Sequence, residues 1–229
     1  MKRILRKIWY FILKCREVLA FEWQRTCRFV RIWTSSVYNW LRGLPKGEAF
    51  SSVADCLVIC AHPDDETIFF SRILKENKPF VLCMSGRGHK VRKMEFHNAL
   101  NYWGIEGVQL NFPDIPGCKW AWKRFAARKL RRLMKCFPNV ETVYTHSGTG
   151  ESGHPHHYAV YHGVKAAFRT CKIYTTASEI PANGTGSLTK IEVKEKYGVI
   201  QTCYPSQIRM LERWCPWWES YINTEYFEE

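Results

Sequence analysis

One short segment of the sequence carries an imidazole and two adjacent carboxylates: Ala-His-Pro-Asp-Asp-Glu at residues 61–66. Its chemically useful members are His62, Asp64 and Asp65. Neighbouring side chains point in different directions, so the two aspartates can take different roles. A hydrolytic zinc centre needs His and carboxylate ligands, and a carboxylate beside the metal can act as a general base. The alternative is a helix start in which one acid caps the helix, which leaves His62 and the other acid unexplained.

A second histidine-rich segment, Gly-Glu-Ser-Gly-His-Pro-His-His, occupies residues 150–157. Pro155 is typical of a first helical turn, so His154 and His157 are expected on one face of a helix. Together with His62 and an aspartate, these rings make a His/Asp donor set, from which a hydrolytic zinc centre normally uses three ligands and leaves one position open for water. A surface tract or a packed core is the alternative for such a histidine cluster.

Both segments follow a predicted strand and precede a predicted helix, the position where open α/β sheets bind ligands. Apolar runs predict strands at 54–60, 79–84, 107–111, 141–145 and 171–177, and helical patterns follow 66 and occupy 91–103, 119–136, 158–168 and 191–200. The alternation predicts a single Rossmann-like α/β domain, with a mostly parallel sheet covered by helices on both faces.

The two segments, about a hundred residues apart, resemble the LmbE/PIG-L family of zinc-dependent N-acetyl-sugar deacetylases. Weaker matches are Arg-x-x-Glu-x-x-x-Ala at 92–99, Phe-Pro-Asp at 112–114 and Tyr-x-Ser-Gln at 204–207. The resemblance spans about residues 54–210. It implies hydrolysis of the acetamide of an N-acetylglucosamine-type sugar.

The resemblance also implies the roles of individual residues. His62, Asp65 and His157 would hold the metal, which would be Zn²⁺, although His/Asp ligation accepts other divalent ions. Asp64 would be the general base that takes a proton from water. His154 would stabilise the oxyanion and protonate the departing amine.

Two further residues are predicted to bind substrate. Arg92 would bind a sugar hydroxyl or a phosphate through its planar guanidinium group. The alternative is an ion pair with Glu95 on a solvent-exposed helix face. Asp114 would accept a hydroxyl from the sugar, or else form a turn beside its neighbouring prolines.

One position departs from the resemblance. The family usually has Asp or Asn where this chain has His156. That residue would lie behind the ligands, where an acid can hold an imidazole in one tautomer. His156 supplies no negative charge, which leaves the charge state of His154 open. A sugar-binding protein on a catalytically impaired deacetylase scaffold is therefore the alternative function.

The net charge of +13 is concentrated near the N-terminus, where residues 1–50 carry a net +8. Apolar residues recur there near the helical period among basic residues and tryptophans, and no helix breaker precedes Gly43. We predict that residues 1–45 form an amphipathic helical segment on an anionic membrane surface, because the charges exclude a membrane-spanning helix. Packing on the domain and a nucleic-acid-binding arm are the alternatives.

These observations divide the chain into the segment 1–45 and a deacetylase-like domain at 50–229. A membrane-bound segment favours a lipid-linked amino sugar as substrate, with a nucleotide-linked sugar as the other candidate, and no nucleic acid is expected. Ten cysteines without a C-x-x-C pair indicate reduced thiols. We therefore expect a peripheral or monotopic protein on the cytoplasmic face of a membrane.

Overall fold

The computed structural model describes residues 54–112, 114, 119–177, 187–208, 216, 219 and 221–223. The predicted N-terminal segment 1–45 lies outside these residues. In chain order the elements are β1 Cys56–Cys60, α2 Asp65–Asn77, β2 Phe80–Ser85, α3 Lys90–Trp103, β3 Gly107–Phe112, α4 Lys119–Met134, β4 Thr142–Thr145, the 3₁₀ turn η1 Glu151–Gly153, α5 Pro155–Ala167, β5 Lys172–Thr176, α6 Lys190–Cys203 and β6 Tyr221–Asn223.

The described strands form one sheet in the order β3-β2-β1-β4-β5-β6. Strands β1 to β5 pair in parallel, and β6 joins β5 antiparallel. This confirms the predicted parallel sheet. The antiparallel edge strand β6 was not predicted, because its three residues lie in an aromatic C-terminal stretch without a clear period of two.

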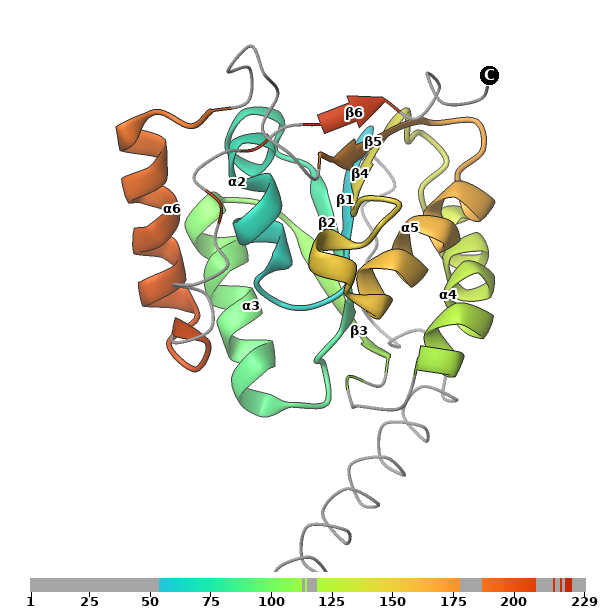
Figure 1. Ribbon diagram of the computed structural model, residues 1–229, viewed down its shortest axis with the longest axis horizontal. Helices are drawn as coiled ribbons and strands as arrows, with labels where there is room; N and C mark the ends of the chain where they lie inside the picture. Colours follow the sequence, from blue (N-terminus) through green and yellow to red (C-terminus); the bar gives the residue numbers. More distant parts are fainter. Residues whose placement is uncertain are drawn as a thin grey trace, which may run out of the picture.

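Helices cover both faces of the sheet, as Figure 1 shows. Side chains of alternate β1 residues point to opposite faces of the sheet. Leu57 and Ile59 pack into the core under α4 and α5. Val58 and Cys60 pack into the core under α2, α3 and α6. A strand buried on both faces needs apolar residues at successive positions. This explains why residues 56–60 are apolar without alternation.

Strand β1 lies at the point where the strand order reverses. Its neighbours are β2 on one side, through Leu57↔Phe80, and β4 on the other, through Leu57↔Val143. The chain leaves β1 toward β2 on one side and leaves β4 toward β5 on the other, so no crossover connection covers the ends of these two neighbouring strands. Open α/β sheets bind ligands at this place.

A buried ion pair fastens the C-terminal part of the chain to the domain. Lys196 Nζ lies 3.0 Å from Glu219 Oε1, and both side chains are 0% exposed. Glu219 also accepts hydrogen bonds from the backbone N–H groups of Ser71 and Arg72. The pair therefore ties α6 and α2 to the strand region around β6.

We expect Lys196→Met to lower the free energy of unfolding by about 3–5 kcal/mol, because it leaves a buried carboxylate without its cation. Urea unfolding followed by circular dichroism measures this. The matched control is Lys75→Met, which breaks the half-exposed pair with Glu195. It should change stability little, because solvent screens such a pair. Equal effects of the two substitutions would contradict the structural role of the buried pair.

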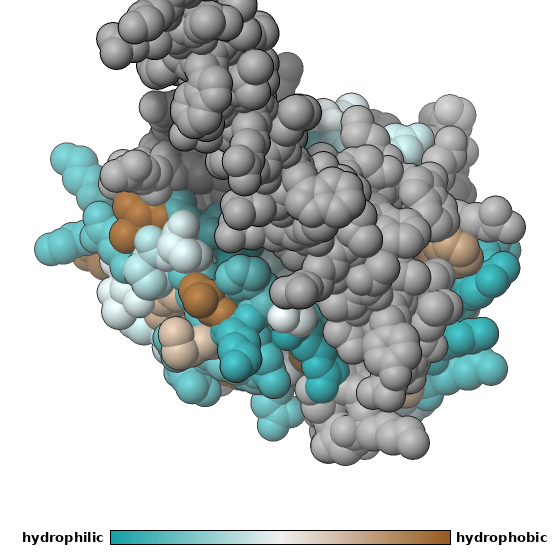
Figure 2. Space-filling view, turned by 90° about the horizontal axis from the view of Figure 1, so that it is seen from below, coloured by the Kyte–Doolittle hydropathy of each residue, from teal (hydrophilic) through white to brown (hydrophobic). Residues whose placement is uncertain are grey.

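The face of the molecule in Figure 2 gives no separate indication of a binding surface where its residues are described. The coloured part of the face in Figure 2 is mostly hydrophilic, with a few separate hydrophobic side chains. Single exposed apolar residues are ordinary on protein surfaces. Within the described ranges, no helix has both the length and the apolar character required to cross a bilayer.

Candidate metal centre

Three predicted ligands meet between the ends of β1 and β4, and we call them the triad: His62, Asp65 and His157. The His62 Nδ1 and Asp65 Oδ2 atoms are 3.2 Å apart, and His157 Nε2 lies 3.3 Å from the former and 3.4 Å from the latter. All three side chains are buried. Segments 95 residues apart in sequence therefore bring one donor atom each to a common point.

The spacing of these donor atoms fits a tetrahedral cation. Bonds of about 2.0–2.1 Å to zinc place two tetrahedral ligands roughly 3.3–3.4 Å apart. The three triad distances are close to this value. Two neutral imidazole nitrogens and one carboxylate oxygen are also the donor types that zinc prefers. The triad residues thus fit the divalent ion that the sequence predicted.

The local chain conformation explains how the triad is held. The His62 backbone N–H donates to Asp65 Oδ2 at 2.8 Å, which fixes the carboxylate across the turn that starts α2. Pro155 occupies the first turn of α5, as predicted, and His157 follows two residues later. The His157 ring reaches His62 in the turn after β1.

A carboxylate that sequence reasoning missed lies behind the triad. Glu151 Oε2 is 2.6 Å from Nδ1 of His157 and 2.9 Å from Nδ1 of His146. These are hydrogen-bond distances, shorter than the separation of two ligands on one cation. The bond from His157 Nδ1–H leaves its Nε2 lone pair free to face the triad, as outer partners of metal-bound histidines do.

His146 is the second residue that was missed. Its ring stacks on His157 with centroids 3.8 Å apart, and its Nε2 accepts the Ala61 backbone N–H at 3.0 Å. The same nitrogen lies 3.3 Å from Asp65 Oδ2. Burial lowers the pKa of His146, but Glu151 and Asp65 outweigh it and raise the pKa to about 9. His146 is thus held between these two carboxylates and supports the site from behind. The sequence could have pointed to His146 as a site residue, because it comes just after the predicted strand 141–145, much as His62 comes just after the predicted strand 54–60.

The charges at this point favour a cation. Burial opposes ionisation of Asp65, yet the His157 and His62 rings hold its pKa well below its usual range. Burial also lowers the pKa of His62 and His157, and Asp65 more than offsets it, so both pKa values are raised. The acids thus attract positive charge to the triad, which protons or a metal ion can provide.

Asp64, the proposed base, faces Arg92. Its Oδ2 accepts from Arg92 Nη1 at 3.1 Å, and Arg92 Nη2 also donates to the Pro63 carbonyl. The Arg92 side chain is only 13% exposed, and Glu95 is farther from it, at 4.0 Å. Burial raises the pKa of Asp64 to about 7, although Arg92 opposes the shift. A carboxylate with that pKa suits proton transfer near neutral pH.

The backbone of Asp64 is strained, with φ of 108°. Such a conformation costs a non-glycine residue about 1–3 kcal/mol and occurs often at functional sites. Glu66 Oε2 accepts the Asp64 N–H at 3.0 Å, and Tyr204 donates to Glu66 Oε1 at 2.5 Å. The C-terminal Tyr-x-Ser motif therefore supports the turn, and its Ser206 likewise donates to Glu95.

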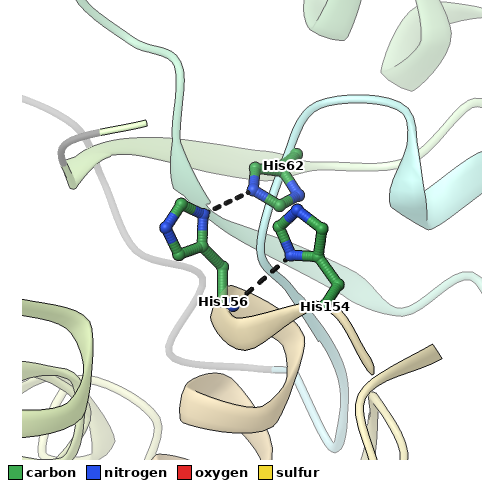
Figure 3. Close-up of side chains that lie close together, drawn as sticks. All are labelled: His62, His154 and His156. Carbon is green, nitrogen blue, oxygen red and sulfur yellow. Dashed lines mark hydrogen bonds between the residues drawn. The ribbon is translucent and has the colours of Figure 1, made fainter. Parts of the chain in front are cut away.

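His154 and His156 lie on the other side of His62. Figure 3 shows the three rings facing one another, with His62 from the turn after β1 and the others from the start of α5. His156 Nδ1 is 3.0 Å from His62 Nε2, and its ring stacks on Trp122 at 4.3 Å between centroids. His154 is the N-cap of α5, and its Nδ1 accepts the His156 N–H at 3.4 Å.

Both of these rings are neutral at physiological pH. Burial lowers the pKa of His154 to about 4, and the nearby His157 and His62 rings add to the effect. Burial, followed by His62, lowers the pKa of His156 to about 3. Because Nδ1 of His154 accepts a hydrogen bond, the proton of its neutral ring is on Nε2. His154 is therefore a hydrogen-bond donor on the side of His62.

Asp114 completes the group that the structure brings together. Its Oδ1 lies 3.5 Å from His62 Nε2 and 3.8 Å from His156 Nδ1, and its side chain is 43% exposed. Of the predicted site residues, the structure thus places five around His62, namely Asp65, Asp114, His154, His156 and His157, and Arg92 lies against Asp64. The roles of these residues stay predictions at this point.

Fold and site together define an open α/β domain with a His/Asp centre of hydrolytic type at its switch point. Residues 57–168 match the PIG-L family, described as GlcNAc-PI de-N-acetylase. This part of the chain is a domain of the PIG-L family, and its solved structural neighbours are LmbE-like deacetylases.

Two curated relatives carry related names. A probable N-acetylglucosaminyl-phosphatidylinositol de-N-acetylase from Schizosaccharomyces pombe is 29% identical over 133 residues, which cover 51% of this chain and 53% of the relative. The N-acetylglucosaminyl-phosphatidylinositol de-N-acetylase of Bos taurus is 29% identical over 143 residues, covering 56% and 52%. The chain thus spans about half the length of these relatives.

The fold is shared with a solved deacetylase structure. The zinc-inhibited form of the teicoplanin deacetylase Orf2 superposes with a TM-score of 0.53 at 16% identity, covering 69% of this chain and 86% of that chain. At this identity the likeness establishes the fold alone. It agrees with the predicted fold class.

The outer carboxylate gives a direct test of the metal centre. We expect Glu151→Gln to weaken divalent-metal binding roughly 10–100-fold, because the amide cannot accept from both His157 and His146 with the same strength. Isothermal titration with Zn²⁺ measures this, and Glu141→Gln, at an exposed position before β4, is the matched control. Unchanged affinity in Glu151→Gln would show that the two rings need no carboxylate behind them.

Proposed function

We propose that this chain is a metal-dependent deacetylase that hydrolyses the acetamide of an N-acetylglucosamine-type sugar. The observation that carries the proposal is the triad, whose three donor atoms have the separations of ligands on one tetrahedral cation. Asp64, which precedes the triad residue Asp65, has a carboxyl pKa of about 7, and His154, whose ring packs on His62, is a neutral histidine that can donate from Nε2.

The chemistry supplied by the bound cation is polarisation of the amide carbonyl and activation of water. Asp64 takes the proton from the attacking water, and Arg92 holds the carboxylate in place for this transfer. His154 donates its Nε2–H toward the oxyanion that develops on the carbonyl oxygen as water attacks the carbon. Asp64, once protonated, has a pKa that allows it to return the proton to the departing amine. The pKa of His154, lowered by burial to about 4, argues against the proton-donor role that the family resemblance implied for it.

His156 takes the place where the family usually has Asp or Asn. With His62 Nδ1 committed to the triad, the His62 ring carries its proton on Nε2 and donates it to His156 Nδ1. The neutral His156 can therefore orient His62 without a negative charge. This supports an active enzyme over the alternative of an impaired scaffold that only binds sugar.

We infer a lipid-linked sugar as the substrate, at an anionic membrane surface contacted by residues 1–45, with the catalytic domain at 50–229. The names of the two curated relatives, which refer to phosphatidylinositol, support a lipid carrier. Asp114, on the exposed side of the site, would accept a sugar hydroxyl, and Arg92 would contact the substrate only through donors that Asp64 leaves free.

The decisive experiment measures acetate release by the purified chain, with its metal content determined, from lipid-linked GlcNAc, UDP-GlcNAc and free GlcNAc. The proposal expects the fastest release from the lipid-linked sugar. Sugar binding without acetate release from any of the three would instead support the binding-protein alternative.

The membrane part of the proposal has its own test. The full chain should co-sediment with vesicles that contain anionic lipid at low salt and should be released as salt is raised. Vesicles of neutral lipid serve as the control. Failure to bind anionic vesicles at low salt would remove the membrane from the proposal and leave the chemistry unaffected.

A further inference from the structure

Four side chains converge on the side of His62 that faces away from the triad, and we call them the outer cluster: His62, His154, His156 and Asp114. His62 belongs to both groups, because its Nδ1 faces the triad and its Nε2 faces the outer cluster. We propose that the outer cluster is a second metal-ion site, which takes a divalent transition metal such as Zn²⁺ and blocks deacetylation when it is filled.

The donor atoms of the outer cluster have the spacing of a ligand set. His62 Nε2 lies 3.0 Å from His156 Nδ1 and 3.5 Å from Asp114 Oδ1, and the last two atoms are 3.8 Å apart. A ligand nitrogen of His154 lies within 4.8 Å of those of the other two rings. Bonds of about 2.0–2.2 Å from one cation reach such a set after small shifts.

Hydrogen bonds within the outer cluster do not explain why these four polar side chains lie together. A proton on His62 Nε2 can serve His156, but the Asp114 carboxylate at 3.5 and 3.8 Å is beyond good hydrogen-bond distance from either ring. Three imidazoles and one carboxylate are a donor set suited to zinc, cobalt or copper. His154 is exposed and Asp114 is 43% exposed, so an ion can enter from solvent.

The second ion is bound more weakly than the first. Binding breaks the N–H bond of His62 Nε2, forms a bond from that nitrogen to the metal, and releases the proton to solvent. It also moves the His154 proton from Nε2 to Nδ1, with loss of the 3.4 Å bond to the His156 N–H. At the triad no change of tautomer is needed, because Glu151 already holds His157 with its Nε2 toward the triad, and only the protons on these rings have to leave.

Inhibition rests on the proposed function. A second ion would use His154, which we assign to the oxyanion, and Asp114, which we assign to the sugar. It would also draw electron density from His62, a ligand of the catalytic ion. The position of His156 decides whether this site exists, because the Asp or Asn usual in the family offers no imidazole there.

The test counts metal ions in the full chain. Protein stripped with a chelator is dialysed against Zn²⁺ or Co²⁺, and its metal is measured by mass spectrometry. We expect two ions for the wild-type chain, one for His156→Asn, and two for the control His162→Asn, whose exposed ring lies on the same helix. Asp114→Asn, an exposed substitution, should weaken the second ion without affecting the fold.

The outcomes separate this inference from the proposed function. One ion in the wild-type chain, or two in His156→Asn, overturns the second site and leaves the deacetylase intact. No ion at all overturns both. With two ions, Zn²⁺ above the first equivalent should inhibit acetate release by the wild-type chain but not by His156→Asn; equal inhibition of both would overturn the inhibitory role.

Discussion

Asp64→Asn is expected to lower acetate release by about 10²–10⁴-fold while the chain keeps its metal, because the amide cannot accept the proton of the attacking water. The substitution is close to isosteric. Asparagine also tolerates the backbone at φ of 108° better than most residues, so the turn should persist. A loss of activity can then be assigned to proton transfer and not to a displaced ligand.

The measurement compares acetate release and metal content for Asp64→Asn and for Asp55→Asn. The control residue is exposed and precedes β1, at the opposite end of the strand from the site. It should retain full activity. An active Asp64→Asn enzyme would end the assignment of Asp64 as the base and direct attention to another proton acceptor near the triad.

His157→Ala is expected to have the second large effect, the loss of metal together with activity. His157 provides one of the three triad donors and is held by Glu151, so its removal should weaken metal binding by more than the roughly 10–100-fold expected for an outer partner. Calorimetry with Zn²⁺ and the acetate assay test both consequences. His162→Ala, farther along α5, is the control.

Metal binding should also appear as thermal stability. For the wild-type chain, Zn²⁺ at about 100 times its dissociation constant is expected to add about 2.7 kcal/mol to the free energy of unfolding. His157→Ala should gain little at the same concentration. Equal stabilisation of both proteins would mean that the principal ion is bound away from the triad.

Much of the fold followed from the sequence, because the strands of a doubly covered parallel sheet are short apolar runs with helices between them. Each of the five predicted strands is present with its ends shifted by at most two residues, and helix α5 begins at the proline that suggested it. Strand β6 could not be predicted, since three residues carry too little pattern and their pairing depends on the exposed edge of β5.

The meeting of His62, Asp65 and His157 was predicted from two strand ends, and the structure places them within reach of one ion. The partners behind them were harder to predict. Arg92 faces Asp64 from another helix, and Glu151 joins His146 to His157 through side-chain directions that a linear sequence does not contain. Such contacts depend on how separate elements pack, for which the periodicity gives no information.

The ligands of the triad come from the turn that leads into α2 and from the first turn of α5, and these helices pack on opposite faces of the sheet. A bound ion would therefore act as a reversible cross-link between the two layers of helices. Chelation should increase amide hydrogen exchange at the start of α2 and at the start of α5 together, because the same bond secures both helices.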